Sequence, residues 1–238
     1  MGLEVSAMDG RVMLVTGGTG ALGSAVSLAA LRAGATVVVT YRDEREWMTL
    51  TDRAPQGGRE RLQGIRADVA NGESVRRLID EVTARHGRLD ALINTVGGFA
   101  GGDLVATDER AWDGMLTLNL RSAYLCCHAA LPTMLAAGRG RIVNVASRSV
   151  VPPAGGFIAY TVSKAGVIAL TQALAQEVRG RGVTVNAVLP STMDTEANRR
   201  AMPSADRRTW VPTDSVARAI LFLASDAAAD VTGTLLAV

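Results

Sequence analysis

Short apolar runs alternate with longer amphipathic stretches along the whole chain. The runs are nearly continuous in apolar residues, which is typical of strands that are buried on both faces of a sheet. They lie at Val12–Val15, Thr36–Thr40, Gln63–Ala67, Ala91–Asn94, Arg141–Ala146, Val183–Val188 and Thr234–Val238. The stretches between them have a helical period and cover about residues 20–33, 43–54, 71–86, 107–137, 156–180 and 213–225.

Alternation of strands and helices at this spacing implies right-handed βαβ crossovers and a parallel sheet. The pattern therefore predicts an α/β protein with a Rossmann-type, doubly wound, seven-stranded parallel sheet and helices on both faces. No linker rich in proline and serine and no internal repeat interrupts the alternation. We expect residues 1–238 to form one domain, with residues 1–10 as an N-terminal extension.

Two segments depart from this alternation. A glycine-rich stretch, Gly97–Gly102, follows the fourth apolar run, and a polar segment at about residues 190–212 follows the sixth. Open α/β sheets bind ligands beyond the carboxyl ends of their strands, where both segments fall. They are expected to form a cleft wall and a substrate lid, with ordinary surface loops as the alternative.

Composition and charge exclude several classes of function. Hydrophobic residues make up 48% of the chain, which excludes a disordered protein, and 25 basic against 23 acidic residues give no support for a nucleic-acid partner. No apolar run reaches the length of a membrane span, and no export segment is recognisable. The only cysteines are adjacent, and no cluster has metal-ligand spacing. A cytoplasmic protein without membrane association or a metal is the expectation.

The first apolar run leads into a glycine-rich turn and then a helical stretch. Gly18, Gly20 and Gly23 have the G-x-G-x-x-G spacing in the strand–turn–helix context that this motif requires. Glycines let the backbone approach a pyrophosphate closely, and the start of a helix presents free N–H groups to it. The motif predicts dinucleotide binding, against the alternative of a purely structural turn.

The end of the second strand bears on the choice of dinucleotide. NAD-binding proteins hold the ribose 2′-hydroxyl with an acidic residue about 20 positions after the motif, and Asp43 fits that count. By register, however, the strand tip is Tyr41, followed by Arg42. Tyr41 cannot repel a 2′-phosphate, and Arg42 can pair with one. The sequence therefore favours NADP(H) over NAD(H), with a solvent-facing Arg42 as the alternative.

A tyrosine and a lysine with helical spacing suggest proton-transfer chemistry. Tyr160 and Lys164 are four residues apart and so share one helix face. A nearby ammonium favours the tyrosinate and lowers the pKa of a tyrosine, and such a pair can protonate an alkoxide or deprotonate an alcohol. Ser147 lies 13 residues earlier, at the tip of the fifth strand. Its hydroxyl can hold a substrate oxygen beside the tyrosine, or it can simply cap a turn.

Together these pieces resemble the single-domain branch of the short-chain dehydrogenase/reductase family, from about Gly10 to Val238. The resemblance extends beyond the glycine-rich loop, Ser147 and the Tyr160/Lys164 pair. It also covers Ala67–Val69, Ile93–Gly97, Leu118–Leu120 and Val185–Pro190. The chain departs from the family pattern at Ala21, where glycine is usual, at Thr95–Val96 and at Ser191. It also stops before the family's usual C-terminal tail.

The resemblance implies a role for each matching residue. Tyr160 is the expected general acid/base, Lys164 lowers its pKa and binds the nicotinamide ribose, and Ser147 polarises the carbonyl. Asn119 is expected to hold a water in a proton relay. Asp68 and Val69 would meet the adenine, and Asn94 would lie near the adenosine ribose. Thr195 would face the nicotinamide carboxamide. The complete cofactor-binding prediction is Gly17, Thr19, Gly20, Ala21, Leu22, Gly23, Tyr41, Arg42, Asp68, Val69, Asn94, Val96, Gly97, Tyr160, Lys164, Pro190, Thr192 and Thr195.

The same resemblance suggests a substrate class. The chain resembles 3-oxoacyl-carrier-protein reductases, which implies an NADP(H)-dependent oxidoreductase acting on a 3-oxoacyl thioester or a similar ketone, with an acyl carrier protein as a candidate partner. Residues 97–102 and 194–210 instead resemble dihydropteridine reductases, which lack the catalytic serine. A dihydropteridine-type reductase is therefore one alternative, and a catalytically silent dinucleotide sensor or scaffold is another.

Two further expectations concern the pocket and the assembly. Apolar side chains of the two unusual segments are expected to line a substrate pocket over the nicotinamide, with packing of the lid as the alternative; they are Phe99, Met193, Met202 and Trp210. In the family, helices like those at 107–137 and 156–180 pair between subunits, so the resemblance implies a homotetramer.

Overall fold

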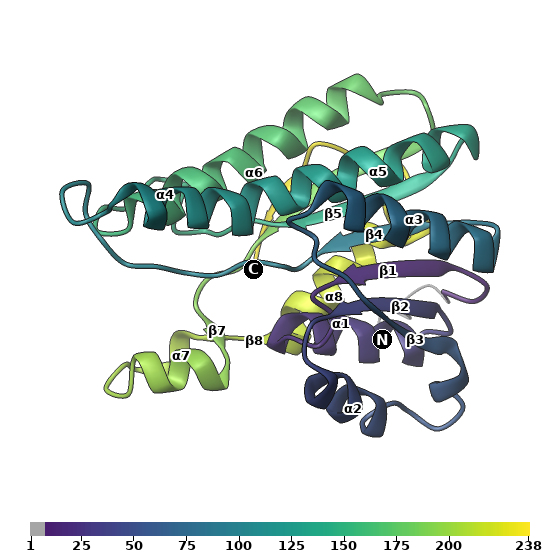
Figure 1. Cartoon of the computed structure of the whole chain (residues 1–238), viewed down its shortest axis with the longest axis horizontal. Coiled ribbons are helices and arrows are strands. Elements are labelled where there is room, and N and C mark those ends of the chain that lie inside the picture. Colours follow the sequence, from purple (N-terminus) through teal and green to yellow (C-terminus); the bar gives the residue numbers. More distant parts are fainter. Residues whose placement is uncertain (1–7) are drawn as a thin grey trace.

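The computed structural model describes residues 8–238. Most of the expected N-terminal extension, residues 1–7, lies outside the described residues. Seven parallel strands form one sheet in the order β3-β2-β1-β4-β5-β6-β9 (Figure 1). Each strand lies within one residue of its predicted bounds: β1 Val12–Thr16, β2 Thr36–Tyr41, β3 Leu62–Arg66, β4 Ala91–Asn94, β5 Gly140–Val145, β6 Val183–Leu189 and β9 Leu235–Ala237. The predicted fold class is confirmed.

The strand order reverses between β1 and β4. From β1 the chain builds β2 and β3 outward on one side, and it then returns to place β4 against the other side of β1. Loops that leave the carboxyl ends of β1 and β4 therefore diverge, which opens a crevice at this point. The glycine-rich turn after β1 and the Gly97–Gly102 segment after β4 both begin at this crevice.

Helices cover both faces of the sheet, because successive strand residues point to opposite sides. In β1, Met13 and Val15 join the core under α1 (Ala21–Arg32) and α8 (Thr213–Ala224), whereas Val12 and Leu14 join the opposite core. The other principal helices are α2 Glu44–Asp52, α3 Gly72–His86, α4 Glu109–Met115, α5 Ser122–Ala136 and α6 Ile158–Glu177. This two-sided burial explains why apolar residues predominate in the inner strands.

Two elements differ from the expected pattern. The helix expected at 107–137 is α4 and α5 joined by a π-helical segment, Leu116–Arg121, which contains Asn119. The polar segment at 190–212 contains two short parallel strands, β7 Met193–Asp194 and β8 Val211–Pro212, with α7 Glu196–Ala201 between them. In Figure 1 these elements project from the body of the molecule. Short 3₁₀ turns complete the secondary structure at Arg59–Arg61, Arg207–Thr209 and Asp226–Ala228.

Within residues 8–238, α6 alone has the length and apolar composition of a membrane-spanning helix. It packs against β5, β6 and the π-helical segment. A core helix passes the same test, so the finding is weak evidence for a membrane.

Candidate active site

The glycine-rich turn after β1 is packed too tightly for side chains at two of its positions. A Cβ atom on Gly23 would lie 2.1 Å from the carbonyl oxygen of Gly17, and one on Gly18 would lie 2.4 Å from Cβ of Val39. Gly17 has a φ of +64° and donates its N–H to Thr40 Oγ1 at 2.8 Å. α1 begins immediately after Gly20, which provides no side-chain cap for its free N–H groups. Such a cradle fits the pyrophosphate of a dinucleotide.

The departure at Ala21 is compatible with this geometry. Ala21 is the first residue of α1 and its side chain is exposed, so its methyl group meets no buried neighbour. Leu22 and Gly23, by contrast, are buried in the first turn of α1. We therefore expect the buried Leu22 side chain and the absence of a side chain at Gly23 to shape the cradle.

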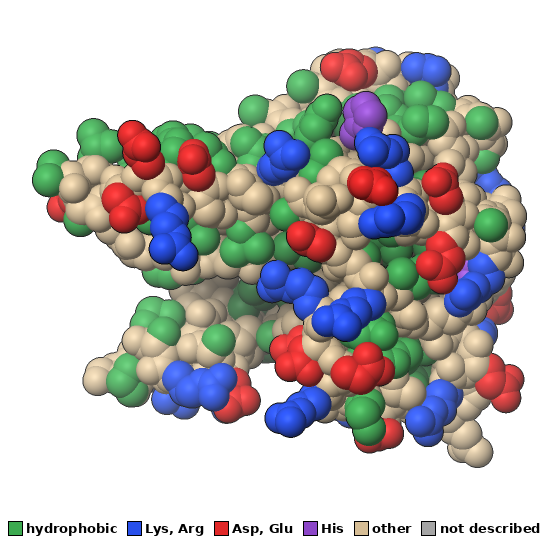
Figure 2. All heavy atoms as spheres, viewed as in Figure 1, with side chains coloured by type: hydrophobic (Ala, Val, Ile, Leu, Met, Phe, Trp, Pro, Cys, Tyr) green, Lys and Arg blue, Asp and Glu red, His purple; other side chains and the backbone are tan. Residues whose placement is uncertain are grey.

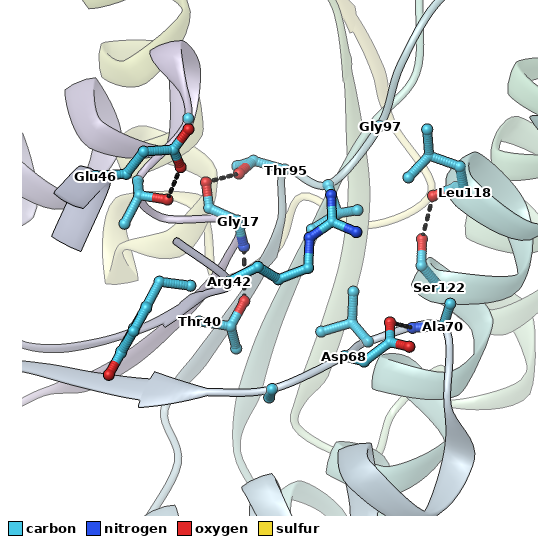
Figure 3. A pocket seen from close by; sticks show the side chains of 16 residues that line it. Gly17, Thr40, Arg42, Glu46, Asp68, Ala70, Thr95, Gly97, Leu118 and Ser122 are labelled. Carbon is cyan, nitrogen blue, oxygen red and sulfur yellow. Dashed lines mark hydrogen bonds between the residues drawn. The ribbon is translucent and has the colours of Figure 1, made fainter. Parts of the chain in front are cut away.

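A cavity of about 270 Å³ lies beside this turn, at the carboxyl ends of β1, β2 and β4 (Figure 3). Pockets for drug-sized ligands begin at about 300 Å³, so this cavity fits one half of a dinucleotide. Half of the predicted cofactor residues line it: Gly17, Thr19, Gly20, Tyr41, Arg42, Asp68, Val69, Val96 and Gly97. Lining residues that the sequence analysis missed are Thr40, Glu46, Ala67, Ala70, Thr95, Leu118 and Ser122.

The Asn94 side chain does not face this cavity. It is buried, and its Nδ2 donates to Asn144 Oδ1 at 2.8 Å and contacts Cys127 Sγ at 3.4 Å. Alternation along β4 places Asn94 on the same face as Leu92, toward α5. The side chain is thus used inside the core, and the expected position of Asn94 near the adenosine ribose stays a prediction that concerns its backbone, at the carboxyl end of β4.

Asn119 fixes the turn that follows β4. Its Oδ1 accepts the Gly98 N–H at 2.9 Å, and its Nδ2 donates to the Gly98 carbonyl at 3.1 Å and to Ser163 Oγ at 3.0 Å. The residue is 1% exposed and sits in the π-helical segment, a local geometry that is frequent at functional sites. Asn119 thereby links the helix that carries Tyr160 to the loop that lines the cavity.

Lys164 reaches the same place from α6. Its Nζ donates to the Val145 carbonyl at 2.8 Å. A Cβ atom on Gly97 would lie 3.0 Å from Lys164 Nζ and 2.8 Å from Asn119 Oδ1, so a side chain here would require one of these two groups to move. Burial lowers the pKa of Lys164 to about 8, because the apolar surroundings disfavour its charged form.

This lowered pKa predicts how stability depends on pH. An unfolded lysine has a pKa of about 10.4, so between about pH 8 and 10 the unfolded chain holds a proton that the folded, dinucleotide-free protein has lost. The contribution of Lys164 to the free energy of unfolding therefore rises with pH across that window, by about 2 kcal/mol from pH 8 to 9.5. Urea unfolding of the unaltered protein and of Lys164→Met measures it. A stability difference between the two that does not change with pH would contradict the prediction.

Tyr160 lies one turn before Lys164 and close to Ser147. Burial raises the pKa of Tyr160, and a hydrogen bond with Ser147 acts in the opposite direction. Within the described chain no hydrogen bond joins the Tyr160 hydroxyl to Lys164, whose Nζ is held by Val145. Ser147 is the group that favours the tyrosinate in this structure, and the expected effect of Lys164 on the pKa of Tyr160 stays a prediction.

Ser147 itself is buried at the carboxyl end of β5. Its Oγ lies 2.9 Å from Ser149 Oγ and accepts the Ser149 N–H at 3.3 Å. The structure thus brings three predicted catalytic side chains, Ser147, Tyr160 and Lys164, to the end of β5. Asn119 approaches them from the π-helical segment.

Aromatic rings surround Tyr160. The Phe99 ring centroid lies 5.0 Å from that of Tyr160, and Phe157 lies 6.0 Å from Tyr160 and 5.6 Å from Phe99. Phe99 is 65% exposed, so its ring is available to a ligand. Phe157 is the residue before α6 and was not predicted from the sequence. Its position three residues before Tyr160 could have indicated that the two side chains lie on the same side of the helix.

The other expected pocket residues belong to the lid segment. Met193 is partly buried and packs against the core under α1 and α8, which agrees with the alternative of lid packing, and its place in a substrate pocket stays a prediction. Met202 is exposed at the end of α7, and Trp210 lies under the Arg207 guanidinium at 6.0 Å. Figure 2 shows a hollow between this lobe and the lobe formed by α4. Of the four expected residues, Phe99 has a ring that contacts Tyr160.

The predicted nicotinamide-contacting residues after β6 make local contacts. The Pro190 carbonyl accepts the Arg148 N–H at 3.0 Å, and the Thr192 carbonyl accepts the Val211 N–H at 2.9 Å. Thr195 caps α7, its Oγ1 accepting the Asn198 N–H at 3.2 Å. Their roles toward a cofactor stay predictions. In residues 8–238 no group of three or more histidine, cysteine or acidic side chains is arranged to hold a metal.

Comparison with known proteins identifies the family. The family model described as short chain dehydrogenase matches residues 11–206. The chain belongs to the short-chain dehydrogenase family. This short-chain dehydrogenase is similar to D-threitol dehydrogenase of Mycolicibacterium smegmatis, with 35% identity covering 95% of this chain and 90% of that protein. It is also similar to the 3-oxoacyl-[acyl-carrier-protein] reductase of Thermotoga maritima, with 30% identity covering 97% of each.

A solved structure supports the same conclusion. The short-chain type dehydrogenase/reductase from Mycobacterium ulcerans superimposes with a TM-score of 0.91 and 28% identity, covering 97% of this chain and 88% of that one. This short-chain dehydrogenase is therefore an oxidoreductase of a family that uses a nicotinamide dinucleotide. The cradle and the cavity described above fit the pyrophosphate and adenosine parts of such a cofactor.

Proposed function

We propose that this enzyme is an NADP(H)-dependent reductase of ketones, with 3-oxoacyl thioesters or similar ketones as substrates. The observation that carries the proposal is the approach of Ser147, Tyr160 and Lys164 at the end of β5, beside a dinucleotide cradle. A hydroxyl that can hold a carbonyl oxygen and a tyrosine that can protonate it are the groups that carbonyl reduction needs.

Each side chain has a part in the proposed reaction. The bound nicotinamide supplies the hydride when a ketone is reduced. Ser147 donates a hydrogen bond to the carbonyl oxygen, and the Tyr160 hydroxyl transfers its proton to the same oxygen as an alkoxide develops. Lys164, whose Nζ lies beside Gly97, would bind the nicotinamide ribose. Asn119 Oδ1 keeps a second lone pair beside its bond to Gly98, which is available to the relay water.

Arg42 supports NADP(H) as the preferred cofactor. Its side chain projects from the end of β2 into the cavity (Figure 3), where it can pair with a 2′-phosphate. The last residue of β2 is Tyr41, which stacks on Trp47 with ring centroids 5.6 Å apart and presents no carboxylate at the strand tip. An acidic strand tip is the feature that NAD-binding proteins use to hold the ribose 2′-hydroxyl.

The substrate class rests on the surface around Tyr160. Phe99 and Phe157 provide an apolar surface beside the reacting carbonyl, which suits an acyl chain better than a polyol. The name of the Thermotoga maritima relative agrees with this choice. Dihydropteridine reductases lack the catalytic serine. The presence of Ser147 beside Tyr160 therefore disfavours a dihydropteridine-type reaction. An acyl carrier protein partner, a homotetramer and a cytoplasmic location complete the proposal.

An assay of cofactor oxidation tests this function. NADPH or NADH is mixed with the purified protein and an acetoacetyl thioester, and the loss of reduced-cofactor absorbance is followed. Turnover that is faster with NADPH at subsaturating cofactor is the expected result. Absence of turnover with the thioester, together with turnover of a quinonoid pterin, would overturn the proposed substrate class.

A further inference from the structure

The dinucleotide cavity contains a carboxylate as well as Arg42. Glu46, in the first turn of α2, lines the cavity and accepts a hydrogen bond from Thr19 Oγ1 at 2.8 Å. Thr19 belongs to the glycine-rich turn, so this bond joins α2 to the cofactor cradle. Figure 3 shows Glu46 beside Gly17, with Arg42 entering the same cavity from β2.

Neither charged side chain is neutralised by a neighbour. Within residues 8–238, Glu46 and Arg42 take part in no ion pair, although ten other arginines do. Both charges therefore act on whatever occupies the cavity. An acidic residue in the first turn also suits the helix dipole, but that role requires neither a place in the cavity nor a bond to Thr19.

The two charges act in opposite directions on a 2′-phosphate. A phosphate monoester carries a charge of about −1.5 to −2 at neutral pH and accepts hydrogen bonds. Arg42 attracts it, whereas Glu46 repels it and also occupies the Thr19 hydroxyl, a donor that a phosphate would use. A ribose 2′-hydroxyl has no such conflict, because it can donate a hydrogen bond to a carboxylate.

We propose that Glu46 is a specificity-determining residue that opposes NADP(H) and favours NAD(H), so that the cofactor preference is the balance of Arg42 against Glu46. This inference rests on the proposed function, since it takes the cavity to hold the adenosine ribose. It goes beyond that function by naming Glu46 as the residue whose charge opposes that of Arg42. It also implies that this enzyme binds both dinucleotides.

Fluorescence titration of the full chain with NADPH and with NADH tests the proposal without any substrate. The variants are Glu46→Gln, which keeps the side-chain size, and Asp52→Asn, which removes the same charge from the last residue of α2 outside the cavity. Glu46→Gln is expected to tighten NADPH binding roughly five- to tenfold, as removal of one like charge near a phosphate implies, and to leave NADH binding equal or weaker. Asp52→Asn is expected to leave both affinities unchanged.

A second variant separates the charge from the hydroxyl. In Glu46→Gln/Thr19→Ala, part of the gain in NADPH affinity is expected to disappear, because the Thr19 hydroxyl, which a neutral glutamine oxygen holds less strongly than a carboxylate does, can no longer donate to the phosphate. Equal changes for NADPH and NADH in Glu46→Gln, or no change in either, would overturn the inference while leaving the proposed function intact. Failure of the unaltered protein to bind either dinucleotide would instead overturn the proposed function.

Discussion

Replacement of Tyr160 with phenylalanine is expected to reduce ketone turnover by about 10²- to 10⁴-fold, the range that general acid–base catalysis contributes. The variant lacks only the hydroxyl that transfers the proton. Phenylalanine retains the ring that packs between Phe99 and Phe157, so the surrounding structure is expected to persist. Steady-state reduction of an acetoacetyl thioester at saturating NADPH measures the effect.

Dinucleotide binding provides the control for this variant. Tyr160 does not line the adenosine cavity, so NADPH affinity measured by fluorescence is expected to stay within a few-fold of that of the unaltered protein. Lost turnover with retained binding would also argue against a silent sensor, in which Tyr160 would have no chemical role. Turnover equal to that of the unaltered protein would eliminate Tyr160 as the general acid.

Most strands could be predicted from the sequence because they are buried on both faces, whereas the edge strands β3 and β9 are only partly buried. A run such as Thr36–Tyr41 has no polar face, so its length is visible directly in the sequence. The same periodicity also fixes which side each residue faces. Applied along β4, it would have placed the Asn94 side chain toward α5 and away from the cofactor.

Other features depend on contacts between distant segments. The π-helical segment around Asn119 differs from an α-helix by one residue in hydrogen-bond spacing, and nothing in its composition marks that change. Glu46 was missed because its importance comes from Thr19, 27 residues earlier in the chain, rather than from its own neighbours. The pKa of Tyr160 could not be predicted from its spacing to Lys164, since the direction of the Lys164 ammonium is set by the Val145 carbonyl.

Among glycine-to-alanine substitutions in the glycine-rich turn, Gly23→Ala is expected to damage the dinucleotide cradle most severely. The new Cβ atom would lie 2.1 Å from the Gly17 carbonyl oxygen and 2.8 Å from Gly18 Cα, both backbone atoms that cannot rotate away. Relief requires α1 to move from the glycine-rich turn. We expect the free energy of unfolding to fall by about 1–3 kcal/mol, as for other overpacked sites.

Movement of α1 also displaces the N–H groups at its start, so NADPH affinity is expected to fall by roughly tenfold or more. Gly114→Ala is the matched control, because a Cβ there in α4 would meet nothing within 4 Å. That change is expected to stabilise the helix by about 0.5–1 kcal/mol and to leave NADPH binding unaltered. Urea unfolding and fluorescence titration measure both effects, and equal behaviour of the two variants would show that the turn accommodates a side chain at Gly23.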